Sequence, residues 1–433
     1  MSRFIPALAV ALAASLNLAA TADAGTPRDA RGFVDQVGVN VHLYYGDTAY
    51  GNYRMVKQRL RELGVRHVRD VSDPDHRQWF YDRVNDLSSN GIKSTLVACP
   101  LGNGGWTVGY DQTLYDLKNK VRGALDGVEG VNEPDQAPYA NRYVQARDCE
   151  FWLNRQSKDG TYGKPLGVPV LGPALAFSSN SPLLGNIGDR ADQAAFHPYP
   201  GGHPPSGRGY TLASQRSDTL RTEFPGRSVS IQATETGYHD AVNCSGCGHK
   251  PTSQRAAAIY MPRLWLEYEQ AGVRRAFSYE LVDQFPDAGR SDPEKNFGLF
   301  ENDWSYKPVA SALKNMIGFL DSPSASPRTP FSYSLSNTAD PDGTGPRGAV
   351  KDMLFQKADG SWWLALWQDS SAWDPDARQD IDNQATTVRV SLERTMNVVG
   401  YRPTQSTGSV GSVRAQSFSA GVDDDVLLVK LTD

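Results

Sequence analysis

The chain contains 433 residues, 21% of which are charged, and its formal net charge at pH 7 is −5. A chain of this length exceeds one ordinary domain and fits a barrel with a small additional module. The sequence has no basic stripe that would indicate a nucleic-acid partner, and beyond the amino terminus it has no apolar run long enough to cross a membrane. We therefore expect a soluble monomer without a nucleic-acid or membrane partner.

Residues 1–24 have the features of a secretory signal. Arg3 supplies the positive start, residues 5–20 form an apolar run that is short for a membrane span, and residues 22–24 form a small-residue cleavage site. The 4 cysteines also fit an oxidising compartment. We therefore expect a secreted or periplasmic protein.

The tight pair Cys244-Ser-Gly-Cys247 predicts a local disulfide that constrains the loop after Glu235. A zinc site that adds His239 and His249 is the alternative, although zinc needs four ligands in good geometry. A free or redox-active pair is the third interpretation. Sequence alone does not fix disulfide connectivity. Two further cysteines are available for a second bridge: Cys99 and Cys149.

Amphipathic helices and apolar strands alternate through the first three quarters of the chain. The unit of helix, glycine and apolar strand recurs, with Gly64, Gly91 and Gly272 at the helix ends. This alternation predicts βα units around a parallel sheet. Eight strands over about 290 residues predict a (β/α)₈ TIM barrel, which we assign to residues 25–322. The expected strands are 37–43, 65–70, 92–98, the run before Glu133, 168–172, 193–197, 228–235 and 275–281.

The last hundred residues have a different pattern. Ser and Pro dominate residues 321–330, which predicts a linker, and we assign it to 323–332. Beyond it, short alternating apolar runs separated by Gly, Pro, Ser and Asp replace the helical period. The expected fold is therefore an α/β TIM barrel followed by a small all-β sandwich at 333–433.

Two glutamates each end a strand-like run. Glu133 stands in the sequence Val-Glu-Gly-Val-Asn-Glu-Pro, and Glu235 stands in Gln-Ala-Thr-Glu-Thr-Gly. Pro134 cannot donate to a sheet ladder and disfavours a helical conformation before it, so we expect Glu133 at the last position of its strand. Its neighbours Glu129 and Asp135 are interpreted as surface or turn residues.

Paired carboxylates at strand ends suit the cleavage of a glycosidic bond. One carboxylic acid protonates the leaving oxygen, and a second carboxylate meets the anomeric carbon. Groups about 5–5.5 Å apart retain the configuration, whereas groups about 6.5–9.5 Å apart admit water and invert it. We predict the short distance, with Glu133 protonated and Glu235 ionised. Either glutamate alone fits a solvated turn, but the pair on the fourth and seventh strands favours catalysis.

These motifs resemble the retaining glycoside hydrolases of clan A, which combine a (β/α)₈ barrel with two catalytic glutamates. The resemblance covers roughly residues 33–322 and implies that Glu133 is the acid/base and Glu235 the nucleophile. It also implies that Asn132 holds the sugar 2-hydroxyl and that Arg69 pairs with the nucleophile. Residues after the sixth strand that orient the nucleophile or the sugar are implied as well: His197 and Tyr199.

The chain departs from that clan at the end of the eighth strand, where many members have Trp. Here the run is Phe-Ser-Tyr-Glu-Leu, and either Tyr279 or Glu280 could face the site. Glu280 would hydrogen-bond substrate or pair with a neighbouring arginine. Three further aromatic residues are candidates for sugar contacts, with loop or core packing as the alternative: Trp106, Tyr238 and Trp304.

The leading functional hypothesis is an exported retaining glycosidase that acts on a β-linked polysaccharide or oligosaccharide. Loops rich in Gly and aromatic residues after the third and eighth strands suggest endo attack. A non-catalytic carbohydrate-binding protein on a barrel scaffold is the first alternative. A metal-dependent hydrolase that uses His197, His239 and an acid is the second, but no HExxH-type spacing supports it. We expect no metal or other cofactor.

Overall fold

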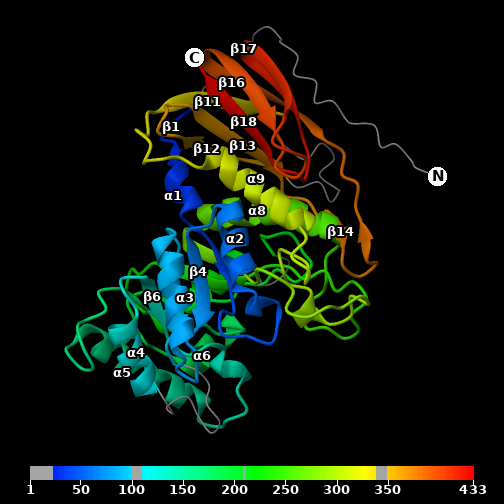
Figure 1. The fold of residues 1–433 in the computed structure, drawn as a ribbon. Helices are drawn as coiled ribbons and strands as arrows, with labels where there is room; N and C mark the ends of the chain where they lie inside the picture. The colour runs from blue at the N-terminus through cyan, green and yellow to red at the C-terminus, as the bar shows by residue number, and fades with distance from the viewer. Residues whose placement is uncertain (1–22, 100–109, 208–210, 338–348) are drawn as a thin grey trace. The chain divides into compact units, whose positions relative to one another are not determined.

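The computed structural model describes residues 23–99, 110–207, 211–337 and 349–433 (Figure 1). It divides into two compact units. One unit comprises residues 35–252 and 267–307, and the other comprises the described residues up to Val34 together with 253–266 and 308–433. Within the described ranges, no helix combines the length and the apolar character needed to span a membrane.

Eight parallel strands form the sheet of the first unit, in the order β7-β6-β5-β4-β3-β10-β9-β8. A parallel bridge between Leu171 and Gln193 joins the two edges, so the barrel is nearly closed. This confirms the expected (β/α)₈ architecture. The strands are β3 (Val37–Asn40), β4 (His67–Val71), β5 (Lys93–Val97), β6 (Leu125–Glu129), β7 (Val170–Leu171), β8 (Ala194–Phe196), β9 (Ile231–Thr236) and β10 (Val273–Ser278).

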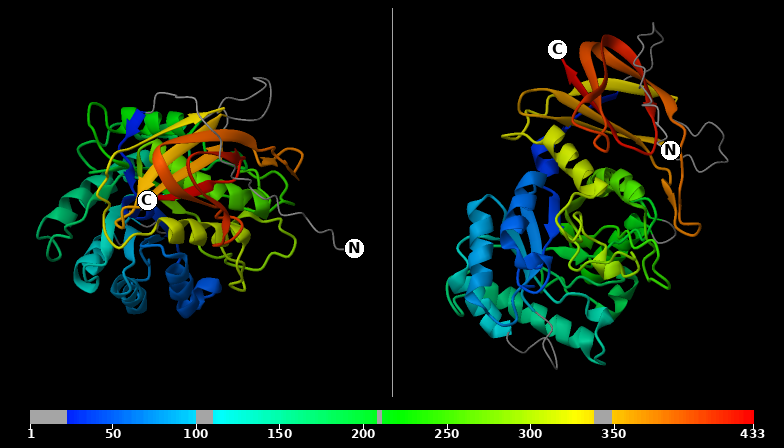
Figure 2. Two further views of the ribbon diagram at one scale, coloured as in Figure 1. Left: turned by 90° about the horizontal axis from the view of Figure 1, so that it is seen from above. Right: turned by 45° about the vertical axis from the view of Figure 1, so that its right-hand side comes forward.

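Helices of this unit lie on the outside of the strands (Figure 2). In α2, Val56, Leu60 and Leu63 recur at helical spacing and are buried, and Gly64 ends the helix with φ +80°. Helix α7 was not expected, because its buried residues include Thr219 and Glu223. The helices are α2 (Tyr53–Leu63), α3 (Gln78–Ser89), α4 (Tyr110–Lys120), α5 (Arg142–Lys158), α6 (Ser181–Leu184) and α7 (Leu212–Glu223).

The second unit contains an all-β region, as expected, together with α1 (Ala30–Val34), α9 (Pro308–Leu320) and most of α8 (Gln254–Gln270). Its main sheet has the order β1-β11-β16-β18-β13-β12-β2, and β17 also pairs with β16. A register shift interrupts β16 between Ser391 and Met396. The main strands are β11 (Phe331–Ser336), β12 (Val350–Gln356), β13 (Trp362–Gln368), β16 (Thr386–Tyr401), β17 (Ser409–Val422) and β18 (Leu427–Thr432).

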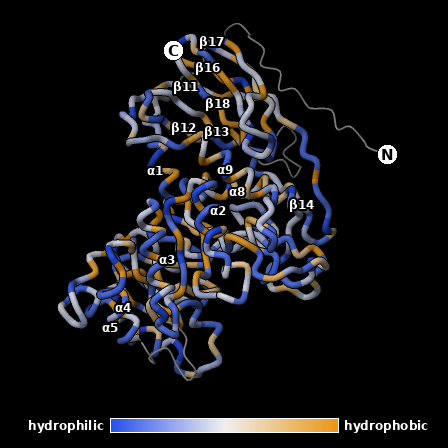
Figure 3. Tube along the Cα trace, in the orientation of Figure 1, coloured by the Kyte–Doolittle hydropathy of each residue, from blue (hydrophilic) through white to orange (hydrophobic). Residues whose placement is uncertain are grey.

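One apolar core fills this region, and Figure 3 shows hydrophobic residues along its strands. Val388 and Val398, on either side of the shift in β16, both belong to that core. Two amino-terminal strands, which were not expected here, join the same sheet. Strand β1 (Asp23–Gly25) is antiparallel to β11, and β2 (Arg28–Asp29) is parallel to β12. A separate pair consists of β14 (Trp373–Asp374) and β15 (Gln379–Asp380).

All four cysteines are disulfide-bonded. Cys244 pairs with Cys247, which confirms the expected local bridge, and Cys99 pairs with Cys149. A disulfide sulfur is not a thiolate ligand, so these pairings exclude the zinc interpretation of Cys244 and Cys247.

Candidate active site

Glu133 stands four residues beyond the end of β6, where the chain turns. Its φ is +44°, and it caps a 3₁₀ turn that begins at Pro134. Its backbone N–H donates to the carbonyl of Ala174 over 2.8 Å, beside a parallel bridge between Asn132 and Ala174. The expectation of a strand-terminal position was therefore wrong. Proline disfavours the right-handed helical conformation at Glu133, and a left-handed residue there starts the turn instead of extending the strand.

Glu235 is the penultimate residue of β9 and is buried, with 9% of its surface exposed. The Nη1 of Arg69 donates to its Oε1 over 2.7 Å, and the hydroxyl of Tyr199 donates to its Oε2 over 2.8 Å. Burial alone would raise the pKa of Glu235, but the positive charges of His197 and Arg69 outweigh burial and lower it. The surroundings therefore hold Glu235 as a carboxylate.

Arg69 extends from β4 and also binds Glu129, the last residue of β6. Its Nε donates to one oxygen of Glu129 over 2.6 Å and its Nη2 to the other over 3.0 Å. The same Nη2 donates to Asn132 Oδ1 over 2.6 Å. Interpreting Glu129 as a surface or turn residue was wrong, because its side chain is fully buried. Arg69 and Glu129 each stand in an apolar strand of the same barrel. Because buried charges require partners, this placement was the sequence signal for an ion pair between them.

Asp135, expected in a turn, lies in the 3₁₀ turn Pro134–Gln136. Its carboxylate accepts hydrogen bonds from the backbone N–H groups of Ala176 and Phe177, each over 3.0 Å. A third comes from the side-chain amide of Asn180 over 3.0 Å. Asp135 therefore fixes the loop after β7 to the turn that carries Glu133.

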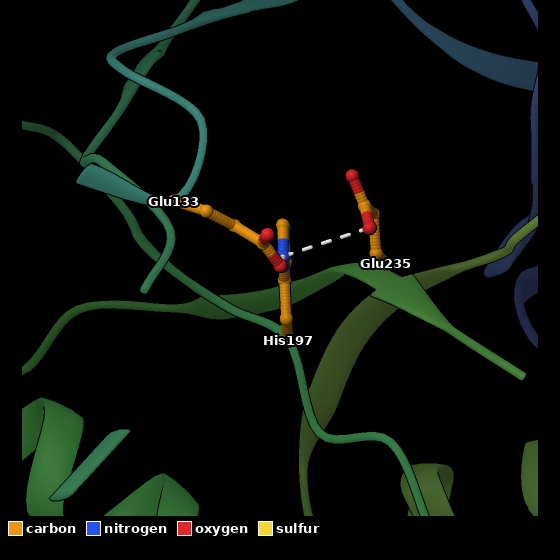
Figure 4. A group of neighbouring side chains, drawn as sticks. All are labelled: Glu133, His197 and Glu235. Atoms are coloured by element: carbon orange, nitrogen blue, oxygen red, sulfur yellow. Dashed lines mark hydrogen bonds and ion pairs between the residues drawn. The ribbon is translucent and has the colours of Figure 1, made fainter. Parts of the chain in front are cut away.

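His197 follows β8 and lies between the two glutamates (Figure 4). Its Nδ1 is 2.8 Å from Glu133 Oε1 and 3.7 Å from Glu235 Oε2, and its Nε2 is 3.2 Å from Thr234 Oγ1. Burial alone would lower the pKa of His197, but the charge of Glu235 and the hydrogen bond with Glu133 raise it. The ring is therefore poised to carry a positive charge.

The two carboxylates converge. One oxygen of Glu133, one oxygen of Glu235 and a ring nitrogen of His197 all lie within 4.8 Å of one another. This spacing would also admit a metal ion, but the guanidinium of Arg69 lies 2.7 Å from Glu235 and would repel a cation. His239, which the metal hypothesis required, directs its Nε2 to the carbonyl of His249 over 2.9 Å instead.

A cavity of about 280 Å³ opens over these groups. The sequence-predicted residues that line it are Arg69, Asn132, Glu133, Tyr199, Glu235 and Tyr279. Seven polar or aromatic lining residues were not foreseen: Asn40, His42, Tyr45, Asp70, His249, Glu294 and Phe297. Asn40 is the last residue of β3 and Asp70 is the penultimate residue of β4, so their place at the carboxyl ends of barrel strands was the available signal.

Between the two candidates after the eighth strand, Tyr279 lines the cavity and Glu280 does not. Glu280 is fully buried and accepts a hydrogen bond from the Tyr50 hydroxyl over 2.9 Å. Its carboxylate also lies 3.2 Å from the Nε2 of His42 and accepts from Gln284. Among the described residues its partners are thus a tyrosine, a histidine and a glutamine, and not the arginine that was considered.

Two of the other three aromatic candidates, Tyr238 and Trp304, do not line the cavity. Tyr238 donates its hydroxyl to the carbonyl of His203 over 3.0 Å. Trp304 is 6% exposed, and its carbonyl accepts from Arg59. Both residues are buried, which leaves little ring surface for a sugar. Trp106 lies outside the described residues.

No protein-family model and no curated protein matches the chain. Solved structures do match it in fold. A family 39 glycoside hydrolase from the gut symbiont Bacteroides cellulosilyticus WH2 has a TM-score of 0.61 at 15% identity, covering 93% of this chain and 82% of its own. A glucosidase from Croceicoccus marinus has a TM-score of 0.62 at 13% identity, with 95% and 98% covered.

A monomeric beta-xylosidase from Caulobacter crescentus CB15 has a TM-score of 0.58 at 14% identity, covering 94% of this chain and 97% of its own. The chain therefore has the fold of these glycoside hydrolases, a (β/α)₈ barrel with an all-β region, as its resemblance to clan A implied.

Proposed function

We propose that the chain is a retaining glycosidase that cleaves β-linked oligosaccharides or polysaccharides, with Glu133 as acid/base and Glu235 as nucleophile. One observation carries this proposal: an oxygen of Glu133 and an oxygen of Glu235 lie within 4.8 Å of each other across the cavity. Because oxygens this close leave little room for an attacking water between them, the arrangement favours the short carboxyl separation of retaining enzymes, about 5–5.5 Å.

The two glutamates have different surroundings that suit their two roles. Glu235 receives hydrogen bonds from Arg69 and Tyr199, which stabilise the carboxylate that attacks the anomeric carbon. Glu133 is more exposed, with 28% of its side chain accessible, and it meets only His197 among these groups. It can therefore reach the glycosidic oxygen of a substrate that enters the cavity from solvent.

The reaction proceeds in two steps. Glu235 forms a bond to the anomeric carbon, the glycosidic bond breaks, and the leaving oxygen takes the proton of Glu133. Glu133 is then a carboxylate and removes a proton from water, whose oxygen attacks the same carbon and releases Glu235. Asn132, held by Arg69 at the cavity wall, is placed to bind the sugar hydroxyl beside the reacting carbon.

The structural neighbours support a β-glycoside as substrate, because one is described as a glucosidase and another as a beta-xylosidase. We also propose endo attack, because the loops after the third and eighth strands are rich in Gly and aromatic residues. We further propose export directed by residues 1–24, action as a monomer, and a catalytic barrel that ends at residue 322 before the 333–433 module. Product lengths released from a polysaccharide panel distinguish endo from exo attack.

Azide rescue tests the two roles separately. With an aryl β-glycoside that needs little acid assistance, E133A should form the covalent intermediate, and azide should convert it to the β-glycosyl azide. E235A should be inactive until azide replaces the nucleophile, and it should then give the α-glycosyl azide. E393Q, at an exposed position of β16, is the control and should keep full activity. Full activity in E235A, or binding of glycans without turnover by the unmodified chain, would contradict the proposal.

A further inference from the structure

The two nitrogens of His197 have different protein partners, and the side chain is fully buried, so these partners decide where its hydrogens lie. Nδ1 faces Glu133 Oε1 at 2.8 Å. Nε2 faces the hydroxyl oxygen of Thr234 at 3.2 Å. Thr234 precedes the proposed nucleophile on β9 and is fully buried.

The hydroxyl of Thr234 has a single hydrogen, and its second neighbour shows where that hydrogen lies. Glu129 Oε1 is 3.0 Å from Thr234 Oγ1. Arg69 donates to both oxygens of Glu129, and a guanidinium has no acceptor, so Glu129 acts as an acceptor on this side of the site. Thr234 must therefore donate to Glu129. Its lone pair then faces Nε2, which has to carry a hydrogen.

We propose that Thr234, oriented by Glu129, is a positioning residue that keeps a hydrogen on Nε2 of His197, so that His197 gains or loses a proton only at Nδ1. Nδ1 is the nitrogen that faces Glu133. The hydrogen-bonded series Arg69–Glu129–Thr234–His197 thus controls which hydrogen bond His197 makes with the proposed acid/base. The hydroxyl of Thr234 and the carboxylate of Glu129 do not themselves contact Glu133.

This arrangement has a consequence for both halves of the proposed reaction. With hydrogens on both nitrogens, His197 donates from Nδ1 to Glu133 Oε1 and leaves Oε2 to exchange the catalytic proton with the substrate. With a hydrogen on Nε2 alone, the lone pair of Nδ1 faces Glu133 and repels its carboxylate form. Glu133 therefore acts as the base only beside a protonated His197.

The charges around His197 favour the protonated ring. Glu133 and Glu235 approach Nδ1, and Glu129 lies beyond Thr234 on the side of Nε2. Arg69 opposes them, but it is already paired with both Glu129 and Glu235. Tyr199 donates to Glu235 and adds no charge. The catalytic meaning of this arrangement rests on the proposed function, whereas the position of the hydrogen does not.

Nitrogen NMR of the whole chain labelled with ¹⁵N-histidine reads that position directly. The unmodified protein should show His197 either doubly protonated or with hydrogen on Nε2 alone across the accessible pH range, with H197Q used to assign the signals. In T234V the neutral ring should carry its hydrogen on Nδ1, since the acceptor for Nε2–H is gone. T234S keeps the hydroxyl and should restore the original pattern.

T236V is the matched control. Thr236 is equally buried on the same strand, but its hydroxyl contacts Pro198 and Tyr268 instead of His197. T236V should leave the hydrogen of His197 on Nε2. A neutral His197 with hydrogen on Nδ1 in the unmodified protein would overturn the inference, and that measurement needs no variant to fold.

Activity provides a second readout. In the unmodified protein, a His197 that has lost its hydrogen on Nδ1 accepts the proton of Glu133 in a hydrogen bond. That proton is then no longer available to the leaving oxygen, so acid catalysis ends. In T234V a neutral ring can still donate from Nδ1, so the alkaline limb of kcat/KM should move to higher pH while the maximum falls. An unmoved limb in T234V would overturn the catalytic part of the inference. Azide rescue that fails at Glu133 and Glu235 would remove the proposed function and leave the NMR result standing.

Discussion

The Nη1 of Arg69 lies 2.7 Å from Oε1 of Glu235, yet Arg69 binds other groups as well. The same guanidinium binds both oxygens of Glu129 and the amide oxygen of Asn132. One cation therefore connects the proposed nucleophile, a buried carboxylate of β6 and the residue before the proposed acid/base. The planar fork of arginine makes several such contacts in fixed directions, which a lysine cannot do.

Replacement of Arg69 by lysine tests that relationship. R69K keeps the positive charge but loses most of the directed hydrogen bonds to Glu235, Glu129 and Asn132. Hydrogen bonds to charged groups contribute about 2 kcal/mol each, so we expect kcat/KM to fall by about 30-fold or more. Steady-state kinetics on an aryl β-glycoside measures the loss. R28K, at an exposed position of β2, is the control, and equal activity in R69K and R28K would contradict the expectation.

Replacement of Tyr199 by phenylalanine tests the control of the nucleophile. The hydroxyl of Tyr199 is one of the groups that lower the pKa of Glu235, so Y199F should raise that pKa. Glu235 must be ionised to attack, and a higher pKa means that Glu235 is already protonated at less acid pH values. The acid limb of kcat/KM should therefore move to higher pH.

The measurement is a pH profile of kcat/KM for Y199F and for the unmodified protein. Y333F is the control, because Tyr333 lies in the all-β region on β11. A fall in kcat/KM with an unmoved acid limb would show that Tyr199 contacts substrate without tuning Glu235.

Glu150 should make the stability of the folded chain fall as pH rises. It lies on α5, is fully buried, and neither of its carboxylate oxygens has a hydrogen-bond partner among the described residues. Burial, together with the charges of Glu129 and Asp192, raises its pKa well above the ordinary value. The folded state then binds a proton that the unfolded state releases, so the free energy of unfolding falls as pH rises from the unfolded pKa towards the folded one.

E150Q removes that ionisation and should flatten the decline in stability above the ordinary glutamate pKa. Urea unfolding at a series of pH values measures it. D189N, at a side chain that is 79% exposed, should keep the original pH dependence. A slope that is the same in E150Q and in the unmodified protein would exclude Glu150 as the cause.

The two disulfides should contribute unequally to stability. Cys99 and Cys149 are 50 positions apart, whereas Cys244 and Cys247 are 3 apart. Loop-closure entropy grows with the logarithm of loop length and gives about 4 kcal/mol for the longer loop and about 2 kcal/mol for the shorter one. C99S/C149S should therefore lower Tm more than C244S/C247S, as thermal unfolding would show. A larger loss in the short-loop variant would indicate that native-state packing outweighs chain entropy.

Local patterns in the chain were enough to predict the barrel and to single out Glu133 and Glu235, which the structure brings together. Glycine stops after amphipathic helices and apolar strands are local signals, and they marked the alternation of helices and strands. Carboxylates at the carboxyl ends of barrel strands share one face, so Glu133 and Glu235 were expected to meet although they are far apart in the chain. The Cys244–Cys247 bridge was also predictable, because its spacing is local.

Tertiary structure alone decided the contacts that link distant strands. Glu129 was misread because its partner Arg69 lies on another strand, and no local pattern distinguishes a buried ion pair from a solvated glutamate. Glu133, in its left-handed turn, donates its N–H to the carbonyl of Ala174, a partner 41 positions away in the chain. The amino-terminal strands β1 and β2 join the all-β sheet through long-range pairing, which such short segments do not encode locally. Such long-range contacts depend on which strands become neighbours when the barrel and the sheet fold.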